Sequence, residues 1–178
     1  MHSKTVLIAV IGSTGSEPEA LRQALESFGY LVILKGIGRP KDLTDILEGT
    51  YPVDFDYLIL SCHGENGAII MPFLAENIYL LDEHPGNFSG EQIARHLALS
   101  GKVIVSSGCT TGGDALCKAF SRANLYIAPI DYVEGNAAVF FVIHLFYELA
   151  KGKALHEAFE QAQKTDEETK LFVLSGWE

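Results

Sequence analysis

Two short stretches of this sequence carry side chains that could do chemistry together. Leu58–Gly67 (LILSCHGENG) contains an adjacent cysteine and histidine, Cys62 and His63, and Val103–Gly113 (VIVSSGCTTGG) places Cys109 46 positions after that histidine. A cysteine attacks a carbonyl group as its thiolate, and a neighbouring histidine can accept or supply the proton. The two stretches therefore indicate acyl transfer by a nucleophilic thiol, provided that the fold brings them together.

Glycines accompany both reactive side chains. Gly64 follows the histidine and Gly108 precedes Cys109. A residue without a side chain lets the backbone N–H come close to a substrate, and it also allows the tight turn that exposes a thiol. Donors for the oxyanion that forms when a thiolate attacks a carbonyl are therefore available in both stretches.

The elements that must position these residues follow from the hydrophobic pattern. Apolar runs are continuous rather than alternating, and segments with helical spacing fall between them, which is typical of strands buried on both faces by crossover helices. We expect an α/β fold, a three-layer α/β/α sandwich with a mostly parallel central sheet of about six strands. The expected strands are residues 5–11, 30–35, 56–62, 102–106, 125–130 and 170–176, and the expected helices lie near 16–28, 43–47, 89–98, 114–120, 136–150 and 151–163.

Local signals refine this outline. Ser16 with Glu19, and Ser89 with Gln92, have the spacing of capping boxes at helix starts. Residues 68–81 are apolar but interrupted by proline and asparagine, so we expect an excursion of short strands or a hairpin there.

Strand ends are the places to look for a site, because ligands of open α/β sheets bind at the carboxyl ends of the strands. His63 ends the third expected strand and Cys109 follows the fourth. Consecutive strands are usually neighbours, so the two side chains are expected to face each other across one edge. Alternation along the strand then turns Cys62 to the opposite face, into the core.

Composition excludes several classes of protein. The chain of 178 residues is long enough for a sizeable core and is interpreted as one domain, residues 1–178. A net charge of -10 argues against nucleic-acid or anionic-membrane partners. Three cysteines without a CxxC pair support neither disulfides nor a metal site. Met1–Lys4 is too short for a secretory signal and no apolar segment has membrane-spanning length, so we expect a soluble cytoplasmic protein without cofactors.

The two reactive stretches resemble the His-Gly and small-small-Cys blocks of the caspase-like cysteine peptidases, which include caspases, metacaspases, gingipain-type and clostripain-type proteases and CHAT domains. The caspase histidine lies about 50 residues before the cysteine, close to the spacing here. Residues 135–163 (GNAAVFFVIHLFYELAKGKALHEAFEQAQ) and the following LFVLSG are similar to the end of CHAT domains.

The resemblance implies a cysteine endopeptidase acting on a protein or peptide substrate. In it, His63 is the general base, Cys109 the nucleophile, and the backbone N–H groups of Gly64 and Cys109 the oxyanion hole. No separate recognition module is visible in the sequence, so a regulatory protein partner is expected to direct the activity.

Specificity is expected to differ from that of true caspases. Thr110 stands where an arginine would help bind an acidic substrate side chain, so cleavage after aspartate is not expected. Asp131 or Glu134, just beyond the fifth expected strand, could line a pocket for arginine or lysine, as acidic residues do in the basic-specific members. Surface carboxylates are common in this acidic chain, so a solvated role stays open for both.

Two other functions remain open at this stage. The same fold could serve as a catalytically silent interaction module. Alternatively, Gly12–Ser16 (GSTGS) after the first strand could cradle a phosphate in a flavodoxin-like flavin- or nucleotide-binding protein, although it lacks a full GxGxxG and a P-loop lysine. His144 and Cys117 are interpreted as packing residues, since both lie on apolar helical stripes.

Overall fold

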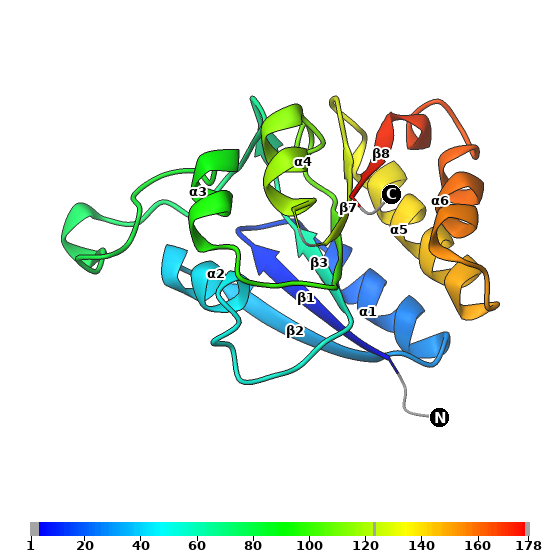
Figure 1. Cartoon of the computed structure of the whole chain (residues 1–178), viewed down its shortest axis with the longest axis horizontal. Helices are drawn as coiled ribbons and strands as arrows, with labels where there is room; N and C mark the ends of the chain where they lie inside the picture. The colour runs from blue at the N-terminus through cyan, green and yellow to red at the C-terminus, as the bar shows by residue number, and fades with distance from the viewer. Residues whose placement is uncertain (1–3, 123, 177–178) are drawn as a thin grey trace.

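A computed structural model describes residues 4–122 and 124–176 of the chain, so Met1–Ser3 of the N-terminal segment lie outside the described residues. A central sheet crosses the molecule (Figure 1). Its order is β2 (Leu31–Ile37), β1 (Thr5–Ile11), β3 (Tyr57–Ser61), β6 (Val103–Ser106), β7 (Leu125–Pro129) and β8 (Phe172–Ser175). The strands from β2 to β7 are parallel, and β8 runs antiparallel to β7.

Helices cover both faces of this sheet (Figure 1). One face packs against α1 (Glu17–Ser27), α5 (Gly135–Ala150) and α6 (Leu155–Gln163). The other packs against α2 (Pro40–Leu47), α3 (Gly90–His96) and α4 (Asp114–Phe120). The expected fold class, a three-layer α/β sandwich with a six-stranded, mostly parallel sheet, is confirmed.

Burial on both faces explains the continuous apolar runs. In β1, Leu7 and Ala9 belong to the core under α2–α4, whereas Val6 and Ile8 belong to the core under α1, α5 and α6. Every position of β3 is buried. Apolar residues are therefore needed at successive positions, and the expected strands agree with the observed ones to within two residues at each end.

The two expected capping boxes are wrong in their hydrogen bonds, although helices do begin at these places. Ser16 precedes α1 and Ser89 precedes α3, but neither side chain forms a capping hydrogen bond. Ser16 has φ -89° and ψ 6° rather than the extended conformation that lets an N-cap side chain reach the first turn. The Gln92 Oε1 atom is buried without a partner among the described residues.

The segment after His63 forms a hairpin that begins earlier than the expected range of residues 68–81, and only its second strand falls within that range. Strands β4 (Gly64–Glu65) and β5 (Ala68–Ile69) pair antiparallel, and the turn residues Asn66 and Gly67 have φ values of 51° and 71°. Two successive positive φ values match the hairpin turn that Asn-Gly favours. The chain then passes through the 3-10 helix η1 (Glu76–Ile78) before it reaches α3; a second 3-10 helix, η2 (Thr169–Leu171), precedes β8.

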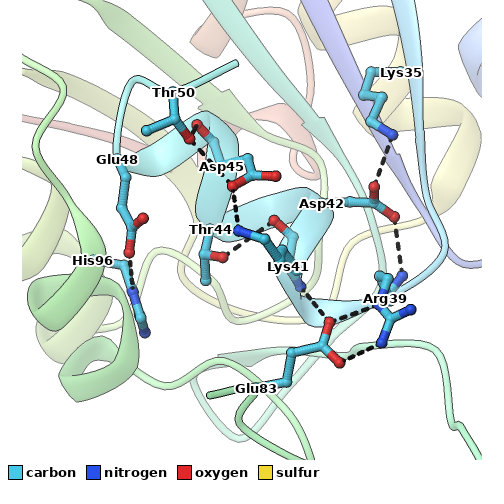
Figure 2. Close-up of polar contacts among 10 residues, drawn as sticks. All are labelled: Lys35, Arg39, Lys41, Asp42, Thr44, Asp45, Glu48, Thr50, Glu83 and His96. Carbon is cyan, nitrogen blue, oxygen red and sulfur yellow. Dashed lines mark hydrogen bonds and ion pairs between the residues drawn. The ribbon is translucent and has the colours of Figure 1, made fainter. Parts of the chain in front are cut away.

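A buried carboxylate fastens this excursion to the body of the protein (Figure 2). Glu83 accepts two hydrogen bonds of 2.7 Å from the Arg39 guanidinium, and others from the backbone N–H groups of Lys41 and Leu80. Its side chain is only 2% exposed. The hydrogen bonds from Arg39 lower the pKa of Glu83 to about 2, so this carboxylate keeps its charge down to strongly acidic pH.

No helix in residues 4–122 and 124–176 combines the length and the apolar composition that crossing a membrane would require.

Candidate active site

The loops that follow β3 and β6 meet at one edge of the sheet. The two strands are neighbours, and His63 and Cys109 lie just beyond their carboxyl ends. The contact is so close that a Cβ atom on Gly64 would lie 2.1 Å from the Cys109 carbonyl oxygen. A Cβ atom on Gly108 would lie 3.2 Å from the Gly64 nitrogen. Both stretches therefore reach one edge of the sheet, and the two glycines are what allows their backbones to touch, whereas the expectation that the His63 and Cys109 side chains face each other stays a prediction.

His63 is exposed and oriented by a main-chain carbonyl. Its Nε2 atom lies 2.8 Å from the carbonyl oxygen of Ser13, in the loop between β1 and α1. A carbonyl oxygen can only accept a hydrogen bond, so the neutral ring carries its proton on Nε2 and keeps the lone pair of Nδ1 free. This tautomer can act as a base through Nδ1.

The Cys109 thiol is half-buried and lies against the loop between β7 and α5. Its Sγ atom is 3.5 Å from both the backbone nitrogen and the carbonyl oxygen of Val133. Within the described residues no hydrogen bond joins the thiol to the His63 ring. Instead, the β1–α1 loop contacts His63 and the β7–α5 loop contacts Cys109. The Val133 N–H can donate a hydrogen bond to the Cys109 sulfur when this is a thiolate.

The turn that carries Cys109 contains a strained residue. Thr110 has φ 59°, in the left-handed region that costs a β-branched residue about 1–2 kcal/mol. Two hydrogen bonds of 3.1 Å hold it there: its N–H donates to the Asp131 carbonyl, and its Oγ1 accepts from the Gly67 N–H. The hairpin and the β7–α5 loop thus fix the turn of Cys109 from both sides.

Of the other two cysteines, Cys62 lies in the core and Cys117 is half-buried against it. Cys62 is 4% exposed, and burial raises the pKa of its thiol to about 12. Burial also raises the pKa of Cys117, whose thiol donates to the Gly112 carbonyl at 3.1 Å. The sequence interpretation of Cys62 as a core residue is confirmed, which leaves Cys109 as the accessible thiol at this edge.

The two acidic residues expected to shape specificity lie in the loop between β7 and α5, whose Val133 backbone contacts the Cys109 thiol. Asp131 and Glu134 flank Val133, and both are exposed. The Asp131 carboxylate accepts a hydrogen bond from the Tyr132 N–H, and the Glu134 N–H donates to the Glu168 carboxylate. Their segment therefore contacts the Cys109 turn through its backbone, while both carboxylates face solvent.

A third carboxylate, that of Glu17, also lies at the site, although the sequence did not predict it there. Glu17 Oε1 accepts a 2.7 Å hydrogen bond from Ser107 Oγ, and Ser107 lies two residues before Cys109. Burial raises the pKa of Glu17, although hydrogen bonds from Ser61 and Ser107 and the charge of His63 oppose the shift. Its position after the first strand was the available signal, because β1 lies beside β3 in the sheet.

A cavity of about 430 Å³ opens between the segments that hold the two reactive side chains. Its lining begins one residue after Ser13 in one loop and two residues after Val133 in the other. Its lining is Thr14, Gly15, Ser16, Glu17, Ala20, Gly135, Asn136 and Val139. The lining contains a carboxylate and no cationic side chain, which suits a cationic or neutral group and disfavours a phosphate. In the described part of the chain, no cluster of three His, Cys, Asp or Glu side chains could hold a metal ion.

The raised pKa of Glu17 predicts a pH-dependent cost to stability. A carboxyl whose pKa is higher in the folded than in the unfolded state loses stability as pH rises through its unfolded value, 4.5, toward its folded value. Glu17→Gln removes this loss while its amide oxygen can still accept from Ser107. We therefore expect the variant to exceed the parent by about 1 kcal/mol in free energy of unfolding at pH 7, with less difference at pH 4.

Urea unfolding at both pH values measures this effect. The control is Glu19→Gln, the same change at an exposed position of the same helix turn. Two results would contradict a desolvated Glu17 charge: an equal change in the free energy of unfolding for both variants, or a gain for Glu17→Gln that is smaller at pH 7 than at pH 4.

The arrangement of strands and helices is that of a caspase-like fold. Two solved structures with this likeness are gingipain R (RgpB), described as an Arg-specific cysteine proteinase, and the complex of Porphyromonas gingivalis RgpB pro- and mature domains. The first has a TM-score of 0.62 at 12% identity, over 97% of this chain and 46% of that one. The second has a TM-score of 0.58 at 13% identity, over 97% of this chain and 47% of that one.

This chain thus spans less than half the length of those solved chains, and at such identities the likeness shows the fold. No protein-family model and no curated protein matches the sequence.

Proposed function

We propose that this protein is a cysteine endopeptidase in which His63 and Cys109 form the catalytic dyad. The observation that carries the proposal is the contact between the His63–Gly64 and Gly108–Cys109 segments at neighbouring strand ends. A base with a free Nδ1 and an accessible thiol thus lie at one edge of a caspase-like fold, together with backbone N–H groups of Gly64 and Cys109 that can serve as the oxyanion hole.

The reaction follows from these groups. His63 takes the proton of the Cys109 thiol, and the thiolate sulfur bonds to the scissile carbonyl carbon. The C–N bond then breaks, and the amine leaves with the proton from His63. The resulting thioester is hydrolysed by a water molecule that gives its proton to His63, which releases the carboxylic acid and restores the thiol.

Basic side chains are the substrate class that the surrounding charges favour. Glu17 lines the adjoining cavity, and Asp131 and Glu134 are exposed beside Val133. In this proposal the carboxylates attract an arginine or lysine at the residue before the cleaved bond. Gingipain R, described as Arg-specific, has a similar fold and supports the same choice.

The proposal also includes a family within the caspase-like fold and a cellular compartment. The long helix α5, the Ala-rich α6 and the closing strand β8 support a place among the CHAT domains. All three cysteines are free, which is consistent with a reducing compartment such as the cytoplasm. A partner protein would then supply targeting.

The test is covalent labelling by a peptidyl acyloxymethyl ketone with arginine before the ketone, read by intact mass and peptide mapping. We expect one adduct, on Cys109. Labelling should disappear in Cys109→Ala and persist in Cys117→Ser, a matched change at the other half-buried cysteine.

Absence of any adduct, or equal labelling of Cys117, would instead favour the silent interaction module. A panel of fluorogenic peptides then tests the preference. Faster cleavage after aspartate than after arginine or lysine would overturn the basic specificity while leaving the peptidase intact.

A further inference from the structure

The edge strand β2 is long and lacks the usual features that prevent an edge from pairing with another strand. This strand, LVILKGI, pairs with β1 in an unbroken register over its whole length of 7 residues, whereas the opposite edge strand β8 has 4. Proteins usually protect edge strands by shortness, proline, a bulge, a free charge or a covering segment. The unbroken register excludes a bulge, and the strand contains no proline.

Alternate residues of β2 direct their backbone groups away from the sheet. The Leu31 N–H donates to the Lys4 carbonyl, which sets the phase of the ladder. In a parallel ladder every second residue bonds to the neighbouring strand, so Val32, Leu34 and Gly36 point their N–H and C=O groups outward. Within the described residues no hydrogen bond reaches these groups, and a Cβ atom on Gly36 would meet nothing within 4 Å.

The side chains at this edge are apolar, and its one charge is already neutralised. Leu31 is 55% exposed. Lys35 is the single charged residue of the strand, and its Nζ atom lies 2.8 Å from Asp42 Oδ1 (Figure 2). Two copies that meet along β2 therefore oppose no free like charges, even though each chain carries a net charge of -10.

We propose that β2 is the interface of a two-fold homodimer, in which the β2 strands of two copies pair antiparallel with Leu34 opposite Leu34. In this register Val32 lies opposite Gly36 of the second copy. All outward residues then fall in hydrogen-bonded pairs, so every outward N–H and C=O finds a partner. Sliding the strands either way leaves some of these groups unpaired.

The interface forms one continuous sheet across both copies. Because β1 separates β2 from β3, the reactive edge lies outside the interface, and the proposal holds whether or not the protein is a peptidase. A single strand pair buries less surface than a typical permanent interface, so we expect a weak dimer that dissociates in the micromolar range.

Cysteine cross-linking tests the register. In a Cys109→Ser, Cys117→Ser background, Leu34→Cys should form a disulfide-linked dimer under mild oxidation, because opposed residues lie about 5.5 Å apart, within disulfide range. Gly36→Cys and Val32→Cys should not cross-link alone, since each lies about 13 Å from its own copy. Mixed together, these two should cross-link with each other.

Analytical ultracentrifugation of the unmodified protein tests the association itself. We expect the mass to rise from 19.4 kDa toward twice that value with concentration, and more readily at higher salt, which screens the net charge. Leu34→Pro removes an outward N–H that forms no hydrogen bond within the described residues, together with a side chain that is only partly buried against the core, and it should abolish the dimer while retaining the circular dichroism of the fold.

A monomer at all concentrations up to about 300 µM, far above the expected micromolar dissociation range, would overturn the proposal. Equal cross-linking of Leu34→Cys and Gly36→Cys alone would do the same, as would a dimer in which Leu34→Cys does not cross-link. If Leu34→Pro does not fold, the cross-linking decides.

Discussion

Gly64→Ala is expected to lower the free energy of unfolding by about 3 kcal/mol and to abolish labelling of Cys109. The added Cβ atom would lie 2.1 Å from the Cys109 carbonyl oxygen and 2.6 Å from Thr111 Cγ2. Backbone atoms cannot swing aside as a flexible side chain can. The hairpin must therefore move away from the Cys109 turn, which separates the proposed base and its neighbouring N–H from the thiol.

The matched control for this prediction is Gly38→Ala. Gly38 is exposed in the loop between β2 and α2, it has no left-handed φ, and an added Cβ atom would meet only Asp42 Oδ2, at an ordinary contact distance of 3.8 Å. Urea unfolding should place this variant within about 0.5 kcal/mol of the parent protein, with Cys109 labelled at the parental rate. If Gly64→Ala behaved in the same way, the close contact between the two segments would be refuted.

His63→Ala is expected to slow the alkylation of Cys109 by a peptidyl acyloxymethyl ketone by about 1,000-fold, with a change in stability of about 0.5 kcal/mol or less. The ring is exposed and, within the described residues, its hydrogen bond is to the Ser13 carbonyl, so its removal costs the fold little. The labelling reaction loses the group that takes the proton from the thiol. The effect should therefore be far larger on the rate than on stability.

The measurement is the second-order rate of labelling by the peptidyl acyloxymethyl ketone, with unfolding by urea in parallel. His156→Ala is the control, because this histidine is exposed on α6, away from the reactive edge. A fall of less than 10-fold for His63→Ala would mean that Cys109 reacts without this histidine, which contradicts the dyad.

Much of the fold could be predicted from local pattern. The apolar runs of β1 and β3 and the helical stripes between strands follow from burial on two faces, a property that each segment shows by itself. The capping box at Ser16 failed because its side-chain hydrogen bond needs an extended residue, and the backbone of Ser16 is not extended. Ser89 is extended and still forms no capping hydrogen bond, so the spacing of the residue types does not by itself determine the bond.

The candidate site, too, was predicted from the sequence only in part. The residue types and their place after strands were sufficient to single out His63, Gly64 and Cys109 and to assign Cys62 to the core. The groups that orient them, the Ser13 carbonyl and the Val133 backbone, were not predicted, because every residue has such atoms and only contact between loops makes them specific.

By itself, the sequence determined the α/β class, the succession of strands and helices and the chemistry that the reactive side chains can do, because these depend on residue type and on periodicity along the chain. Only the tertiary structure decided that Glu17 is half-buried and hydrogen-bonded to Ser107 at the reactive edge, that Ser13 orients His63, and that β2 lies at the margin of the sheet. Those features depend on the order of the strands, and strand order arises from contacts between segments far apart in the chain.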